Sequence, residues 1–455
     1  MGVAIKVSIP PSPHLPIPPP PRTPSSEMDI PEQLLDLALK AGAEAAEVYQ
    51  AKSLARPVFF EANRLKQLES TQSEGIALRL WKDGRPGIAV AYGAVEPSIL
   101  VAKSIELSAL NDRETPELNL ANLNVYPDLG ATISTEELLG MGKESIELVR
   151  SKFPDVICSS QWDCDIETTR LVNSLGLDSS YSDTTLSGYL AVEWIRGDDF
   201  LSVGDGQTQR GELDPAKIAQ SIVKRLEWAK NNVKPPTGKV PVLFTAKAAD
   251  MLWETVEAAM NGKQVYEGAS PWSDRLGQKV ISPLLTLMQQ PNRGPFSCPF
   301  DDEGSPTQSL TLIQDGILKL FYTDRTIGRQ LGCGSTGNGF RSGLGSYPTP
   351  DLVNLTVAPG LVSFPELVKQ LDSGIIIDQI LGGGAGMSGD FSINVELGYR
   401  VRNGEIVGRI KDTMVSGNVY TALKQVVVVG ADIDWNGPCH TPSLIVEGLS
   451  VTGRG

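Results

Sequence analysis

Apolar positions along the chain become periodic from about residue 29. Asp29 is placed to cap a helix, Pro31 falls at an early helical position, and the apolar residues that follow recur with helical spacing. A second helix is expected over 97–110. Residues 29–110 are therefore expected to form an N-terminal α/β domain. Between the helices, short apolar runs predict strands at 45–49, 58–61, 75–81 and 87–92.

A central α/β domain is expected over residues 111–234. Ser134 and Glu137 have the spacing of a capping box, which predicts a helix that runs to residue 152. Asp214 is placed to cap a further helix, and the proline-containing segment 231–239 is typical of a linker. Strands are expected between the two helices at 156–165, 167–173, 181–194 and 200–207.

Residues 235–455 are rich in glycine and in short apolar runs, which predicts a β-rich C-terminal domain. Thr245 is expected to cap a helix over 246–260, and Gly262 is expected to end it. The predicted strands lie at 240–244, 309–314, 317–322, 354–358, 374–380, 391–402, 405–410, 425–432 and 443–452.

Two dipeptides in this region are strong signals for tight hairpins. Asp315-Gly316 and Asn403-Gly404 each separate two apolar runs, and both residue types tolerate the left-handed backbone of a two-residue turn. The predicted fold class is therefore α+β. An N-terminal α/β lobe of two small subdomains is followed by a large, mostly antiparallel β-sheet or open barrel.

The charge balance argues against several classes of function. The 455 residues have a formal net charge of −14, and an acidic surface repels the phosphates of nucleic acids. No apolar run approaches the roughly 20 residues that span a bilayer. The five cysteines include no Cys-x-x-Cys pair, as is typical of reduced thiols. We expect a cytoplasmic protein that binds neither nucleic acid nor membrane.

Two further features limit the chemistry. Residues 1–28 are rich in proline and poor in large apolar side chains, so a disordered tail is expected. The two histidines, His14 and His440, lie at opposite ends of the chain, so a zinc ion held between histidines is not expected.

Three segments are candidates for chemistry. Glu254 lies on the predicted helix 246–260, whose spacing is also that of an ordinary core helix. Three successive carboxylates, at 301–303, precede a flexible turn and can be arranged around a hard cation. A glycine loop at 382–386 follows a strand, as in a phosphate-binding loop. Neither Lys-Ser/Thr nor a helix follows it, so a wide turn between strands is the favoured interpretation.

Together these segments resemble one family. The third region is similar to the TldD/PmbA family, often labelled modulators of DNA gyrase, and within it to the PmbA (TldE) branch. The matching stretches keep their order and spacing over almost the whole region. They lie at 299–308, 311–319, 335–339, 354–360, 381–391, 398–407, 411–418 and 444–449.

The resemblance has implications for the metal. The metal-binding branch of the family carries His-Glu-x-x-x-His on a helix, and the comparable helix here keeps Glu254 but has Trp253 and Ala258 at the two ligand positions. Neither side chain donates a lone pair to zinc. The resemblance therefore implies that this chain has no metal of its own, that zinc belongs to a TldD-type partner, and that the chain is not catalytic alone.

The function implied is that of a PmbA/TldE-like subunit of a metallopeptidase complex acting on peptides or unfolded segments. An open sheet edge of the third region is expected to hold the peptide as an added strand. The expected chamber lining is Asp301, Asp302, Glu303, Gly382, Gly383 and Gly384. Two alternatives stay open: a stand-alone homodimer that binds peptides without cutting them, and a hydrolase with a different metal at residues 301–303.

Overall fold

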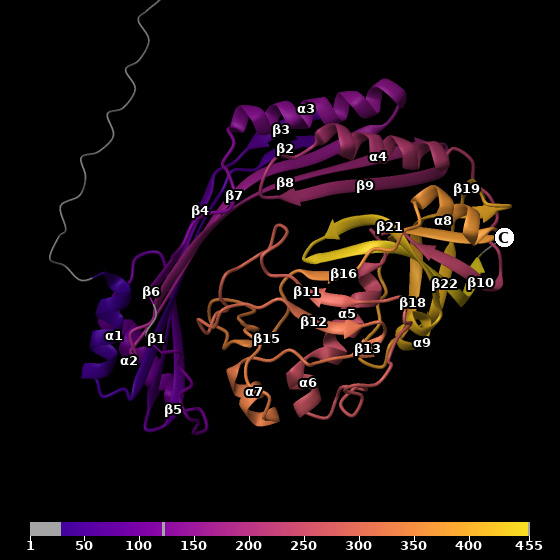
Figure 1. Ribbon diagram of the computed structural model, residues 1–455. Coiled ribbons are helices and arrows are strands. Elements are labelled where there is room, and N and C mark those ends of the chain that lie inside the picture. Colours follow the sequence, from indigo (N-terminus) through magenta and orange to yellow (C-terminus); the bar gives the residue numbers. More distant parts are fainter. Residues whose placement is uncertain (1–28, 121–122, 454–455) are drawn as a thin grey trace, which may run out of the picture.

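The computed structural model describes residues 29–120 and 123–453 (Figure 1). A long curved sheet, drawn in indigo to magenta, arches over a β-rich C-terminal domain drawn in orange and yellow. The predicted proline-rich tail, 1–28, lies outside the described residues. Over the part that is described, no helix combines the length and the apolar character needed to cross a membrane.

The arch is a nine-stranded sheet within the described residues. Its central path runs in the order β3-β2-β7-β1-β4-β5, and β8 continues it by pairing with β7, β6 and β9. Because β1 pairs with both β4 and β7, one sheet runs through both of the predicted N-terminal segments. The strands are β1 Ala45–Ala55, β2 Val58–Glu61, β3 Arg64–Leu68, β4 Thr71–Lys82, β5 Arg85–Tyr92, β6 Leu123–Tyr126, β7 Ile157–Asn173, β8 Asp178–Arg196 and β9 Asp199–Gln209.

Strand β7 differs from the prediction of two strands with a break near residue 166. It is one strand of 17 residues. Its pairing with β8 continues without interruption through Asp165, Ile166 and Glu167. The polar residues that suggested a break lie inside a ladder whose backbone hydrogen bonds do not depend on side-chain polarity.

Four helices cover the arch. Near one end lie α1 Ile30–Lys40 and α2 Pro97–Ser108, and along the other lie α3 Thr135–Lys152 and α4 Pro215–Trp228 (Figure 1). The predicted caps are confirmed. Asp29 accepts a hydrogen bond from the first helical amide, Ser134 and Glu137 form the reciprocal capping box, and Asp214 accepts from the amide of Lys217.

The C-terminal domain is built on a closed ring of five strands. Strands β10, β17, β18, β20 and β22 pair in that order, and β22 pairs back with β10. The α+β prediction is therefore confirmed, and the barrel is closed where an open one was also considered. The ring consists of β10 Gly238–Phe244, β17 Gly374–Ile380, β18 Asp390–Arg402, β20 Thr413–Asn418 and β22 Cys439–Gly453.

Further strands extend this ring. From β22 the sheet continues through β16, β11, β12 and β13, while β19 pairs with β18 and β21 with β22. The predicted hairpin turns are confirmed, because Asp315 and Asn403 and the glycine after each have positive φ. These strands are β11 Leu287–Gln289, β12 Leu310–Gln314, β13 Ile317–Leu318, β16 Leu355–Val357, β19 Glu405–Arg409 and β21 Val426–Asn436; β14 Gly339–Phe340 and β15 Thr349–Pro350 pair separately.

The helix over 246–260 was predicted with the wrong start, while its predicted last residue, Met260, is confirmed. Helix α5 is Asp250–Met260, and Thr245 accepts the amides of Ala248 and Ala249 through its backbone carbonyl in a preceding turn. Gly262 begins a separate short helix instead of ending α5, because Asn261 is extended and caps the new turn with its side chain. The remaining helices are α6 Gly262–Tyr266, α7 Arg325–Leu331, α8 Phe364–Leu371 and α9 Val419–Lys424.

Candidate functional site

Helix α5 is embedded in the barrel core and presents one acidic residue to the surface. Trp253 is fully buried, and its indole Nε1 donates a hydrogen bond to Thr441 Oγ1 at 2.7 Å. Glu254 follows about 100° further round the helix and is exposed. The indole nitrogen carries its proton and has no free lone pair, and Ala258 offers only a methyl group. These two residues therefore do not fit a zinc ion.

The glycine loop lies beside this helix. Glu254 and the glycines 382–384 line one cavity of about 240 Å³, together with Lys247 and Asp250. The hydroxyl of Thr255 donates to the carbonyl of Ala385 at 3.3 Å and ties the loop to α5. Glycine is required at Gly383, because its φ is +84° and a Cβ there would lie 2.5 Å from the carbonyl oxygen of Ser392.

A second cavity of about 580 Å³ adjoins the first and shares Lys247 and Ile380 with it. It lies where the arch meets the barrel. We call the two cavities together the seam groove. It is lined from the arch mainly by Tyr189, Gly204, Asp205, Gly206 and Thr208, and from the C-terminal domain mainly by Lys247, Asp250, Glu254, Asp378, Gln379, Gly382, Gly383, Gly384, Glu396 and Trp435.

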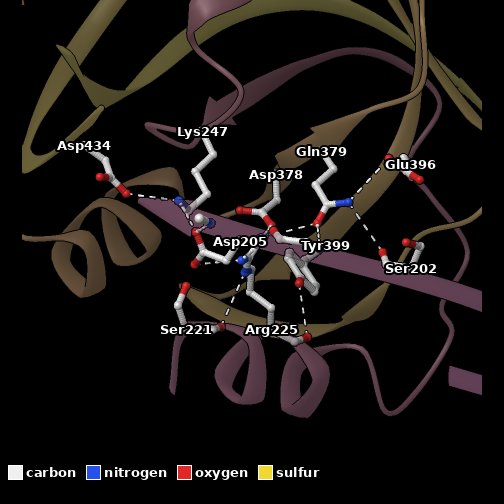
Figure 2. A network of polar contacts seen from close by, with 12 residues as sticks. Ser202, Asp205, Ser221, Arg225, Lys247, Asp378, Gln379, Glu396, Tyr399 and Asp434 are labelled. Carbon is white, nitrogen blue, oxygen red and sulfur yellow. Dashed lines mark hydrogen bonds and ion pairs between the residues drawn. The ribbon is translucent and has the colours of Figure 1, made fainter. Parts of the chain in front are cut away.

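A polar network crosses the floor of the seam groove (Figure 2). Arg225 of α4 pairs with Asp205 of β9 at 2.9 Å and with Asp378 of β17 at 3.1 Å, and all three residues are buried. Lys247 pairs with the same Asp205 at 2.5 Å and with Asp434 at 3.1 Å. Each cation thus joins an element of the arch to an element of the barrel.

The charged groups of this network stabilise one another's ionised state. Burial by itself raises the pKa of Asp205, but the attraction of Arg225 and Lys247 outweighs it and holds that pKa below its ordinary value. Burial lowers the pKa of Lys247, but Asp205 and Asp434 more than compensate and raise it. Asp205 and Lys247 therefore stay charged at neutral pH, and Lys247 is engaged by two carboxylates.

The carboxamide of Gln379 also bridges the two halves. Its Oε1 accepts a hydrogen bond from the amide of Gly204 at 3.0 Å (Figure 2 shows the side chain). Its Nε2 lies 3.5 Å from the carbonyl oxygen of Ser202 and 3.4 Å from Glu396 Oε2. One side-chain amide thus contacts both a donor and an acceptor on the backbone of β9.

The acidic triplet is placed differently from the glycine loop. Asp301 is fully buried, and its carboxylate accepts the amides of Glu303, Ser305 and Gly339 at 2.8–3.0 Å. Asp302 accepts the amide of Arg341 at 2.7 Å. Both carboxylate oxygens of Asp301 are therefore engaged by backbone amides, and these hydrogen bonds stabilise the turn.

The surroundings of the triplet form a second junction between the halves. Glu303 accepts the amide of Arg325 at 2.9 Å. Arg341 of the C-terminal domain pairs at 2.6 Å with Glu47 of β1, which also pairs with Arg79. Burial raises the pKa of both Asp301 and Glu303. Among the described residues, no group of three or more His, Cys, Asp or Glu side chains is arranged to hold a metal ion.

Several lining residues were not found from the sequence. Tyr189, Lys247 and Glu396 come from three separate segments and carry no local motif, so only the tertiary structure brings them together. Cys439 is buried beside α5, and burial and the charges of Glu257, Asp250 and Glu254 raise the pKa of its thiol.

Comparison with known proteins gives consistent matches along the chain. Residues 237–453 match the model of the PmbA/TldA metallopeptidase C-terminal domain, and residues 46–107 match that of the PmbA/TldA metallopeptidase domain 1. The two models together span more than half of the chain.

Individual proteins match nearly the whole length of this chain. Metalloprotease PmbA of Escherichia coli O157:H7 is 28% identical, over 94% of this chain and 97% of its own. The PmbA homologue of Haemophilus influenzae is 25% identical, over 92% and 94%. The crystal structure of TldE from Thermococcus kodakarensis superposes with a TM-score of 0.87 at 22% identity, over 93% of this chain and 100% of that one, and so has the same fold.

Proposed function

The chain belongs to the PmbA/TldD family of metallopeptidases, and on this premise we propose that it is the PmbA/TldE-type subunit of a two-subunit peptidase. Its partner is a TldD-type subunit that binds the zinc ion. The substrates are peptides or unfolded segments, which this chain binds and orients in the seam groove.

The buried Trp253 is the observation that carries this proposal. A packed indole that donates to Thr441 occupies one position at which the metal-binding branch has a ligand, and a methyl group occupies the other. Glu254 remains exposed at the cavity, but without a metal to activate water it has no nucleophile to serve as a base. Cleavage therefore depends on the zinc of the partner.

Binding is the role left to this chain's own residues. The groove has concave walls from both halves, and the ion pairs of Arg225 and Lys247 fix the distance between those walls. A rigid, preformed groove reduces the entropy lost when an extended peptide binds.

The test is to purify the chain alone and together with a His-Glu-x-x-x-His homologue from the same cell. Zinc content and cleavage of an unfolded protein are measured for each preparation. We expect the chain alone to be free of zinc and inactive, and cleavage to appear in the co-eluting complex. A matched partner with Gln in place of the motif Glu serves as the control, because it retains assembly and zinc and loses cleavage.

Two results would contradict the proposal. Stoichiometric zinc or cleavage in the chain alone would show that Trp253 and Ala258 do not mark a lost site. A chain that binds peptides as a homodimer, and that neither co-elutes with the homologue nor alters its activity, would favour the stand-alone peptide-binding protein. Light scattering on the eluted peaks separates these assemblies.

A further inference from the structure

Strand β9 has a backbone edge that faces the seam groove. Within the described residues β9 pairs only with β8, and Gly204, Gly206 and Thr208 line the larger cavity. The amide of Gly204 points away from β8, because it donates to Gln379. Backbone directions repeat every second residue in an antiparallel strand, so the amides and carbonyls of Gly206 and Thr208 point the same way. The amide of Gly206 donates to the carboxylate of Asp205 at 2.8 Å, which leaves the carbonyl of Gly206 and both backbone groups of Thr208 to pair with a ligand.

The side chain of Gln379 shows what this edge accepts. Its carboxamide accepts from the amide of Gly204 and lies 3.5 Å from the carbonyl oxygen of Ser202, as the carbonyl and the amide of one residue in a neighbouring strand would. A carboxamide and a peptide group offer the same donor and acceptor. The edge that continues from Gly206 to Thr208 is therefore chemically matched to further amides, and an extended peptide supplies these at the required spacing.

An aromatic surface lies next to this edge. The ring of Tyr189 lies against Gly204 and Gly206, where an added Cβ would stand 2.0 Å and 3.0 Å from atoms of the tyrosine side chain. The two glycines leave room for the ring over β9. Tyr189 remains 52% exposed and lines the larger cavity. An accessible aromatic ring attracts a cationic side chain.

The groove is lined mainly by carboxylates, so its charge is complementary to that of a cationic ligand. Five carboxylates and one lysine line its two cavities: Asp205, Asp250, Glu254, Asp378, Glu396 and Lys247. The ion pairs of Lys247 and Arg225 engage Asp205 and Asp378. In the described part of the chain, Asp250, Glu254 and Glu396 have no ion pair. A positive charge on the ligand would compensate them.

We propose that the seam groove binds a basic peptide as an added strand on β9. The peptide pairs with the carbonyl of Gly206 and with the amide and carbonyl of Thr208, and it places a lysine or arginine side chain on Tyr189, beside Glu396. This inference rests on the proposed function in that it names the class of peptide which the subunit binds. It does not depend on the partner, because all of these residues belong to this chain.

Binding of fluorescein-labelled peptides by the purified chain, measured by anisotropy, tests the charge preference. Three peptides of one sequence carry Arg, Gln or Glu at a central position. We expect the Arg peptide to bind about fivefold more tightly than the Gln peptide, the factor expected for one exposed ion pair. Glu396→Gln should remove most of this preference. The matched variant Glu405→Gln, which neutralises an exposed carboxylate outside the groove lining, should retain it.

The backbone contact is tested separately. Thr208→Pro removes the amide that points to the groove, and it should weaken all three peptides about five- to tenfold, as the loss of one hydrogen bond predicts. Thr208→Val keeps the amide and should bind like the wild-type chain. Equal affinity for the three peptides, or equal binding by the two Thr208 variants, overturns this inference and leaves the proposed subunit role intact. Absence of peptide binding by both the chain and the complex overturns the proposed function as well.

Discussion

Trp253 Nε1 lies 2.7 Å from Thr441 Oγ1 and joins helix α5 to strand β22 inside the barrel. Trp253→Phe should lower the free energy of unfolding by about 1 kcal/mol, because it removes this hydrogen bond and little volume. Trp253→Ala should lower it by about 3–5 kcal/mol, because it also leaves a large cavity. Urea denaturation followed by circular dichroism measures both values. If Trp253→Ala lowered the free energy of unfolding by less than Trp253→Phe does, the indole would not anchor α5.

Arg225 compensates two buried carboxylates that belong to different halves of the molecule. Arg225→Gln should lower the free energy of unfolding by about 3–5 kcal/mol, because it leaves Asp378 buried without its cation and leaves Asp205 with Lys247 alone. Arg402→Gln removes an exposed arginine of the C-terminal domain and should change stability by less than about 0.5 kcal/mol. Similar values for the two variants in urea would contradict the bridging role of Arg225.

Glu257 makes stability depend on pH. Burial, with repulsion from Asp351 and Glu254, raises its pKa from 4.5 to about 8. The folded state therefore keeps a proton that the unfolded state releases, and this stabilising contribution is full below pH 4.5 and lost as the pH rises towards 8. Glu257→Gln lacks this titration. Its free energy of unfolding relative to that of the wild type should therefore rise by about 2 kcal/mol between pH 5 and pH 8. Parallel urea curves at the two pH values measure the gain, and a constant difference would contradict it.

Two glycines in one helix should respond in opposite directions to the same change. Gly140 of α3 is exposed with open space around it, so Gly140→Ala should stabilise the protein by about 1 kcal/mol. Gly142 is buried, and a Cβ there would lie 2.2 Å from the ring of Phe60 in β2. Gly142→Ala should therefore destabilise by about 1–3 kcal/mol. Thermal unfolding of both variants measures the difference, and shifts of equal sign would contradict the packing of α3 on β2.

Local signals allowed much of the fold to be predicted. The caps at Asp29 and Ser134 and the turn at Asp315-Gly316 depend on a few neighbouring residues, so their patterns are visible in the sequence. Strand β3, Arg64–Leu68, was missed because all of its residues are exposed and no apolar alternation marks it. The continuity of β7 was missed because its middle depends on pairing with β8 and not on its own composition.

The candidate site was less accessible to sequence reasoning. Glu254 and Gly382 were candidates from their local patterns and took their expected roles from the family resemblance, and the structure places them in one cavity although 127 residues separate them in the sequence. Lys247, Tyr189 and Glu396 carry no motif, because their role depends on the arch closing over the barrel. The buried state of Asp301 depends on the fold in the same way, since a run of acids is more often solvated.

The closure of the barrel by β22 has a consequence for biosynthesis. Strand β10 pairs with β22 from Gly238 to Phe244, and β20, β16 and β21 also pair with it. None of these edges can be satisfied until the ribosome has made β22. The nascent chain therefore carries unpaired strands through most of the translation of this domain, and it should need a chaperone to protect them from aggregation. A premature stop codon just before Cys439 would leave every one of those edges open.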